Sequence, residues 1–214
     1  MEANKTIELN EKLDMRKILP VFVIILIDLL GLTIIIPLMP FYAASYGADA
    51  SLIGLLGAVY PAAQFIGAPF LGRLSDRFGR KPVLIISQIG TLLGFLVLGF
   101  ARSLWMIFLA RLIDGLSGAN ISTAQAVISD GTNEKTRTQG LGLVGAAFGI
   151  GFVFGPVIGF VALALGSNNY HIPAFVSAFF SLVSILMTVF MLKETLNPEN
   201  KAQSLTSKRE ISLR

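Results

Sequence analysis

Three charged side chains occur inside long apolar stretches of the sequence: Asp28, Arg111 and Asp114. A charge near the middle of a bilayer is costly, so each side chain is expected to face a bundle interior or an aqueous cavity. A buried carboxylate can bind and release a proton there. Arg111 and Asp114 share a helix face, so a local ion pair that only neutralises charge is the alternative for Asp114. The three residues predict a proton-coupling site in a shared polar cavity.

Further polar residues extend this expected cavity. Ser122 and Gln125 continue roughly the helix face that carries Arg111 and Asp114, so we include Gln125 in the predicted site. Gln64, in an earlier apolar stretch, either lines the same cavity or bonds a neighbouring helix. The sequence does not decide between these two interpretations of Gln64.

A short, strongly charged turn separates two of the apolar stretches. It reads Gly72-Arg73-Leu74-Ser75-Asp76-Arg77-Phe78-Gly79-Arg80-Lys81. Its charges require water, and its glycines allow two helices to end close together. We therefore expect fixed ion pairs within this turn.

A later apolar stretch is rich in glycine. It contains Gly142-x8-Gly151-x3-Gly155-Pro156-x2-Gly159, with further glycines at 145 and 149. Small residues let helix backbones approach closely in a membrane, and proline removes a backbone donor and bends a helix. The pattern predicts close helix contacts, and plain packing is its simplest interpretation.

The elements that must position these residues follow from hydropathy. Hydrophobic residues make up 54% of the chain and charged residues 14%, against roughly 25% charged in an average soluble domain. Apolar stretches of about 20 residues predict membrane-spanning helices. We count six such spans: 18–42, 52–72, 83–100, 104–129, 139–165 and 172–192. The first is not interpreted as a signal peptide, because it is too long and contains Asp28.

The basic residues predict the orientation of the spans. They gather before the first span, in 73–81, in 135–137 and after the last span, whereas the alternate side holds only Arg102. The positive-inside rule then places both termini in the cytoplasm. We expect a cytoplasmic segment at 1–17, a six-helix domain at 18–192 and a cytoplasmic tail at 193–214, in the inner (cytoplasmic) membrane. The net charge of +4 follows this topology and does not indicate nucleic acid.

An internal repeat links the two halves of the chain. Leu-Ile-Asp ending at Asp28 recurs at Asp114, 86 residues later, and Pro69-x-x-Gly72 recurs at Pro156-x-x-Gly159, 87 residues later. Three spans per unit is an odd number, so the second unit is inverted relative to the first. Inverted repeats are typical of transporters. The predicted fold class is all-α, a bundle of six transmembrane helices made of two inverted three-helix repeats.

Together these residues resemble a known family. The turn 72–84 resembles the signature loop of the major facilitator superfamily, and the glycine–proline pattern resembles its antiporter motif. Asp28-Leu29-Leu30-Gly31 through Pro40, with Ala110-Arg111, is most similar to the tetracycline efflux branch of its drug–proton antiporters. The resemblance covers nearly all of residues 18–196.

The resemblance implies a role for each motif. Asp76 and Arg80, with Asp130 as a partner, would form an ion-pair network that stabilises the outward-open state on the cytoplasmic side. Asp28 and Arg111 would serve proton coupling. The gating motif would comprise Gly72, Asp76, Arg77, Gly79, Arg80, Lys81 and Asp130, and the antiporter motif Gly142, Gly151, Gly155, Pro156 and Gly159.

Two positions depart from the family pattern. Phe160 stands where a second glycine usually ends the antiporter motif, and Asp114 stands where these exporters commonly have a small residue. The family normally has twelve spans, so this chain would be the N-terminal half: a fragment, a truncated product or a half that dimerises. Its expected partners are a second six-helix half, membrane lipid, protons and a small-molecule substrate.

Three functions compete for this pattern. The first is proton-coupled efflux of small amphipathic drugs, tetracycline-like or otherwise, and the second is a sugar or organic-anion carrier of the same superfamily. The third is an intramembrane serine protease, because Gly115-Leu116-Ser117-Gly118 matches G-x-S-G and His171 is available. A serine nucleophile needs a histidine within hydrogen-bond reach, but Ser117 lies deep in its span and His171 near the outer surface. We therefore expect a transporter and no enzyme. The chain has no cysteine, which excludes thiolate metal sites, and we expect neither metal nor cofactor.

Overall fold

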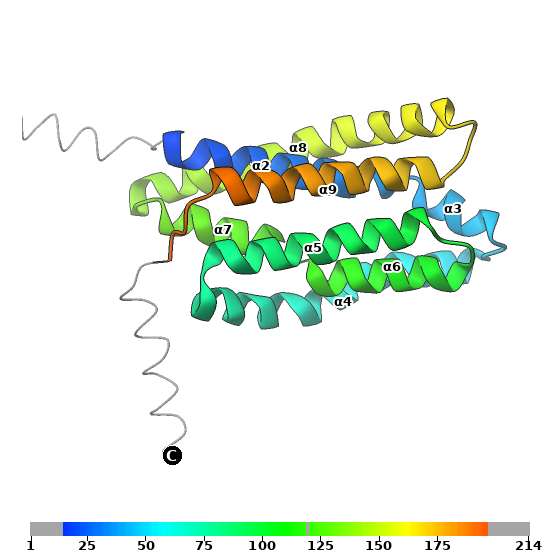
Figure 1. The fold of residues 1–214 in the computed structure, drawn as a ribbon, viewed down its shortest axis with the longest axis horizontal. Coiled ribbons are helices and arrows are strands. Elements are labelled where there is room, and N and C mark those ends of the chain that lie inside the picture. Colours follow the sequence, from blue (N-terminus) through cyan, green and yellow to red (C-terminus); the bar gives the residue numbers. More distant parts are fainter. Residues whose placement is uncertain (1–14, 119, 197–214) are drawn as a thin grey trace, which may run out of the picture.

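The computed structural model describes residues 15–118 and 120–196, which form helices and turns without a strand. Six segments of this range are long and apolar enough to cross a membrane. In Figure 1 the helices lie lengthwise beside one another, and the described chain begins and ends at the same end of the bundle, here named the terminal end. The helices are α2 (Met15–Ile35), α3 (Met39–Ser45), α4 (Ala50–Phe78), α5 (Arg80–Gly99), α6 (Leu104–Ser117), α7 (Asn120–Asp130), α8 (Glu134–Leu165) and α9 (His171–Met191). Residues 1–14 and 197–214, with most of both predicted terminal segments, lie outside the described residues.

The helices pack as two interlocked three-helix units. The first unit comprises α2, α4 and α5, and the second comprises α6 with α7, α8 and α9. The first helix of each unit packs against the second and third helices of the other unit, and the two third helices, α5 and α9, pack on each other. Contacts between α4 and α5, or between α8 and α9, are fewer. This exchange of partners is the arrangement expected of an inverted repeat.

The first predicted span is shorter than expected, because the helix stops before a proline. Residues 36–38 form a turn between α2 and α3. Pro37 disfavours helical geometry at the residue before it, and Pro40 fits the first turn of α3, where no backbone donor is needed. The stretch 18–42 is therefore one membrane helix followed by a short separate helix.

The charged turn is mostly helical. Helix α4 continues to Phe78, well past Gly72, and only Gly79 separates it from α5. Gly79 has a φ of 118°, a conformation that side chains rarely adopt. Helix α8 also begins earlier than predicted, at Glu134, because Asn133 and Thr136 form a capping box there.

The fourth predicted span is broken. Helix α6 ends at Ser117 with Gly118 as its cap, and α7 begins at Asn120. The break shifts the faces of the two pieces, so the polar stripe predicted from α6 does not continue along α7. The Nε2 of Gln64 on α4 donates to the Gly118 carbonyl oxygen at 2.6 Å, which satisfies a backbone group freed by the break.

Two apolar clusters hold the bundle together at its two ends. One includes Ile34, Phe95 and Ile107, and the other, nearer the terminal end, includes Val21, Leu84 and Val127. Along the helices a polar layer lies between these clusters. It contains Asp28, Thr91, Asp114 and Asn120, among other residues.

Candidate functional site

The polar layer brings Asp28 to an amide that the sequence reasoning missed. The Nδ2 of Asn120 donates to Asp28 Oδ2 at 2.7 Å and lies 3.4 Å from Thr91 Oγ1. These residues come from α2, α7 and α5, so the break before α7 is what delivers Asn120 to the centre. A signal for Asn120 exists, because a buried amide in an apolar stretch is costly unless it has a partner.

Arg111 pairs with Asp114 rather than with Asp28. Asp114 Oδ2 lies 3.2 Å from Arg111 Nη1, and the two side chains are only 1% and 5% exposed. The guanidinium also lies 5.8 Å from the ring centre of Tyr60 and 5.7 Å from that of Phe95, within cation–π range. Arg111 Nε and Nη2 have no hydrogen-bond partner among the described residues. The local ion pair considered from the sequence is therefore present.

A small cavity joins the two acids. It measures about 10 Å³, close to the smallest volume that holds one water molecule. The residues that line it are Asp28, Leu29, Leu32, Tyr60, Thr91, Asp114, Gly118, Asn120 and Ile121. Asp28 Oδ1 and Asn120 Oδ1 are buried without a hydrogen-bond partner in the described chain. With Arg111 beside it, the cluster holds two carboxylates and one guanidinium.

The two glutamines take different places. Gln64 is bound to the Gly118 carbonyl group, so it bonds a neighbouring helix, and it does not line the cavity between Asp28 and Asp114. Gln125 is exposed on α7, away from this cavity. Gln125 therefore does not join the cluster of Asp28 and Asp114 within this chain, and its place in a wider central cavity stays a prediction.

The charged turn forms an ion-pair network, defined here as Asp76, Arg80 and Asp130. Arg80 Nη1 lies 2.5 Å from Asp76 Oδ1, and Arg80 Nε lies 2.9 Å from Asp130 Oδ2 at the end of α7. Arg80 Nη1 also donates to Ser75 Oγ at 3.3 Å. The network therefore ties α4 and α5 to α7.

Other members of the charged turn lie around this network. Arg77 is exposed and rests on the ring of Phe78, 5.2 Å from its centre. Lys81 Nζ donates to the Val189 carbonyl oxygen of α9 at 2.7 Å. Gly72 has no neighbour that a side chain would meet, so its glycine is not required by contacts within this chain.

Part of the glycine pattern forms a tight contact between α8 and α2. Gly151, Gly155 and Gly159 are buried on one face of α8. A Cβ at Gly155 would lie 2.7 Å from Thr33 Cβ, and one at Gly159 would lie 2.6 Å from the backbone oxygen of Ile34. Thr33 Oγ1 lies 2.8 Å from the Gly151 carbonyl oxygen. The glycines allow this approach, as small residues do in membranes.

The rest of the glycine pattern does not take part in that contact. Gly142 is exposed, and a Cβ there, or at Gly145 or Gly149, would meet nothing within 4 Å. Gly142 therefore makes no close helix contact within this chain, and its part in the predicted motif stays a prediction. These glycines lie on a different face of α8. Pro156, next to Gly155, lies inside the helix, which continues through it.

Ser117 and His171 do not meet. Ser117 packs on Gly90 of α5, whereas His171 Nδ1 contacts Tyr42 Oη at 2.9 Å and the Gly99 carbonyl oxygen at 3.0 Å. Nine residues of helix separate Gly90 from Gly99, about 13 Å. His171 is half-buried and hydrogen-bonded at the start of α9.

This fold and these motifs are those of a known family of membrane proteins. The family model of the Major Facilitator Superfamily matches residues 21–213, and the chain belongs to that family. It is therefore a multi-pass membrane protein of a transporter family and not an enzyme.

Individual relatives narrow the resemblance. The chain is 40% identical to the class B tetracycline resistance protein of Escherichia coli over 85% of this chain and 45% of that protein. It is 33% identical to multidrug resistance protein 2 of Bacillus subtilis, over 86% of this chain and 46% of that protein. The crystal structure of the human organic anion transporter MFSD10 matches with a TM-score of 0.76 at 28% identity, over 86% of this chain and 49% of that one. The chain thus spans about half the length of the curated relatives it matches.

Proposed function

We propose that this chain forms one half of a proton-coupled exporter of small amphipathic drugs, with tetracycline-like compounds first. The observation that supports proton coupling is the net charge of the buried cluster. Asp28, Asp114 and Arg111 together have one negative charge in excess when all three are ionised. Such a charge is costly in a bilayer interior, and one bound proton removes it. The proposed substrate class rests on the similarity to the tetracycline and multidrug resistance proteins.

Each acid has a separate part in this proposal. Arg111 already neutralises Asp114, to which it is paired. Asp28 instead accepts a hydrogen bond from a neutral amide, that of Asn120, so we assign the transported proton to Asp28. Asp114 lines the same cavity, so its negative charge interacts with Asp28 more strongly when Asp28 is ionised than when it is protonated.

The proposal is tested with Asp28→Asn, in a transporter completed by its second half. The variant imitates the protonated acid permanently, so it should still bind drug but lose accumulation against a gradient. Drug efflux from vesicles with an imposed pH gradient measures this loss. Asp49→Asn is the matched control: Asp49 caps α4 outside the cluster, and asparagine caps a helix equally well. Undiminished uphill export by Asp28→Asn would remove Asp28 from the mechanism.

The second half would cover the outer faces of α4 and α8. These two helices are the least buried of the spans, and both carry open glycines. Lipid contact does not require glycine, whereas close helix contact does. The glycines concerned are Gly54, Gly57 and Gly72 on α4 and Gly142, Gly145 and Gly149 on α8. Gly145→Trp should then abolish co-purification with a separately expressed second half. Ile89→Trp, at an exposed position of α5 away from these faces, should not.

We propose that the protein lies in the inner membrane. In the proposed orientation, the terminal end of the bundle faces the cytoplasm. The chain has no cysteine, so single cysteines can be introduced cleanly. Arg77→Cys and Asn168→Cys lie at opposite ends of the bundle and should react with impermeant reagents from opposite sides. Labelling of both from the same side would contradict the topology.

An organic-anion carrier is the second candidate. Its support is the match to the solved human organic anion transporter, together with the unpartnered Nε and Nη2 of Arg111. These donors could meet an anionic group of a substrate. Competition between tetracycline and a simple aromatic carboxylate for export by the completed transporter distinguishes the two candidates.

A further inference from the structure

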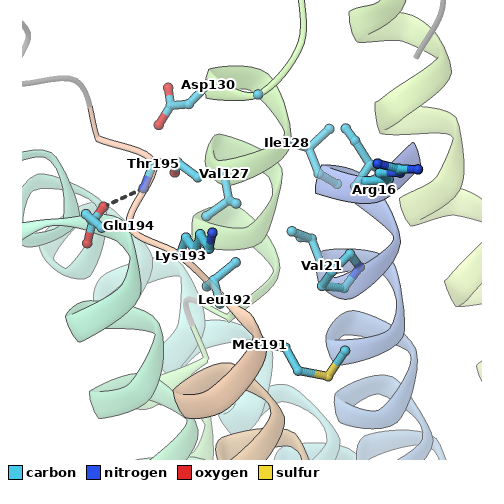
Figure 2. A pocket seen from close by; sticks show the side chains of 13 residues that line it. Arg16, Val21, Val127, Ile128, Asp130, Met191, Leu192, Lys193, Glu194 and Thr195 are labelled. Carbon is cyan, nitrogen blue, oxygen red and sulfur yellow. Dashed lines mark hydrogen bonds between the residues drawn. The ribbon is translucent and has the colours of Figure 1, made fainter. Parts of the chain in front are cut away.

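The segment 193–195, which follows α9, borders a cavity on one side, so it is not packed against other residues all round. Leu192 is buried in the apolar cluster at the terminal end, but Lys193, Glu194 and Thr195 line a cavity of about 610 Å³. Figure 2 shows this cavity between the segment and the neighbouring helices, with Arg16 of α2 on its far side. Packing alone therefore does not fix residues 193–195.

Glu194 supplies the contact that does fix them. Its Oε1 accepts a hydrogen bond from the backbone N–H of Arg80 at 2.9 Å, and its Oε2 accepts one from Lys81 at 3.1 Å. The first N–H groups of a helix have no partner within the helix, and its N-terminus favours a negative charge. Glu194 thus caps α5 from a position more than a hundred residues away.

The charge state of Glu194 suits this role. Partial burial by itself would raise the pKa of Glu194. The backbone N–H groups of Leu196, Arg80, Lys81 and Thr195 outweigh that effect, so the pKa is lowered. The carboxylate is therefore held in its ionised form.

The turn before α5 is shaped around this carboxylate. A Cβ at Gly79 would lie 2.5 Å from Glu194 Oε2, and the φ of Gly79 is already one that glycine favours. Lys81 Nζ adds a bond to the Val189 carbonyl oxygen in the last turn of α9. The start of α5 is thus held from one side by α9 and the segment after it.

We propose that Glu194 is a positioning residue of the ion-pair network. By holding the backbone of Arg80, it directs the guanidinium to Asp76 and Asp130, and opening of the network releases the segment 193–196. The importance of this contact for export rests on the proposed function. The contact itself does not, and it can be measured on the purified chain.

Ser75 provides a reporter for the network. It is fully buried and lies under the Arg80 guanidinium, so a Ser75→Cys side chain reacts with a thiol reagent only when the network opens. Glu194→Gln in this background should raise the labelling rate roughly tenfold, because a charge-assisted hydrogen bond is lost. Glu134→Gln makes the same chemical change in the first turn of α8, outside the network, and should leave the rate unchanged.

A double variant distinguishes two roles of Glu194: positioning Arg80 in the network, or only capping the start of α5. If Glu194 acts through Arg80, Glu194→Gln should add little to the labelling rate once Asp130→Asn has opened the network. Independent, multiplying effects would show that Glu194 only stabilises the end of α5 and would overturn the proposal, as would an unchanged rate in Glu194→Gln alone. Glu194→Asp, which keeps the charge but shortens the reach, serves the same test if the glutamine variant does not fold. Loss of export with normal labelling would instead concern the proposed function.

Discussion

The contact between α2 and α8 yields a quantitative prediction, because two glycines on α8 differ sharply in their surroundings. A Cβ at Gly155 would lie 2.7 Å from Thr33 Cβ, where ordinary contacts are 3.4–4 Å. A Cβ at Gly149 would meet nothing within 4 Å. The substitutions Gly155→Ala and Gly149→Ala therefore add the same methyl group to one helix with opposite expected results.

The magnitude follows from three effects. Overpacking costs about 1–3 kcal/mol, and moving the Thr33 hydroxyl away from the Gly151 carbonyl oxygen costs about 0.5–1.5 kcal/mol. Alanine is favoured over glycine in a helix by about 1 kcal/mol. Gly155→Ala should thus destabilise the chain by about 2 kcal/mol, whereas Gly149→Ala should stabilise it by up to about 1 kcal/mol.

Thermal unfolding of the purified chain in detergent measures both variants. For a chain of this size, 1 kcal/mol corresponds to roughly 2–4 °C in Tm. Gly155→Ala should lower Tm by roughly 4–8 °C, and Gly149→Ala should leave it unchanged or raise it by roughly 2–4 °C. Equal shifts for the two variants, or a more stable Gly155→Ala, would refute the close contact between α2 and α8.

Three further predictions concern the polar contacts. Asp76→Asn should change stability by less than about 1 kcal/mol, since Asp76 is half-exposed, yet it should impair export by a completed transporter, because Arg80 loses one partner; full export in a vesicle assay would mark Asp76 as a surface charge only. Gln64→Leu leaves the Gly118 carbonyl group unpaired and should lower the free energy of unfolding by about 1–3 kcal/mol, and an unchanged denaturation midpoint would contradict this. The pKa of Glu194 is lowered in the folded chain, so its stabilising effect is complete above the ordinary value near 4.5 and is lost as the pH falls below it. The difference in Tm between the wild type and Glu194→Gln should therefore shrink on acidification, and a difference that is constant with pH would argue against an ionised cap.

Hydropathy predicted the number and order of the spans, because length and apolar character decide whether a segment crosses a membrane. The interruptions were not predicted. The turn at 36–38 follows from Pro37, whose effect is readable from the sequence. The carbonyl group freed by the break at Gly118 is instead satisfied by Gln64, which comes from another helix. A contact between residues so far apart leaves no trace in local periodicity.

The same distinction applies to the candidate site. Asp28, Arg111 and Asp114 stand out from any apolar sequence, so they were found. Asn120 was missed because it reaches Asp28 only after α7 has turned away from the line of α6. Gln125 was included for the opposite reason, since an unbroken helix would have carried it along the face of Asp114.

The exchange of helices between the two units has a consequence for synthesis. Helix α2 packs mainly against α8 and α9, and the amide that bonds Asp28 lies 92 residues further along the chain. The first span therefore leaves the ribosome well before its main partners, α8 and α9, exist. Until the fourth span follows, the Asp28 carboxylate lacks the amide of Asn120, so we expect the first helix to move fully into lipid late in the assembly of this bundle.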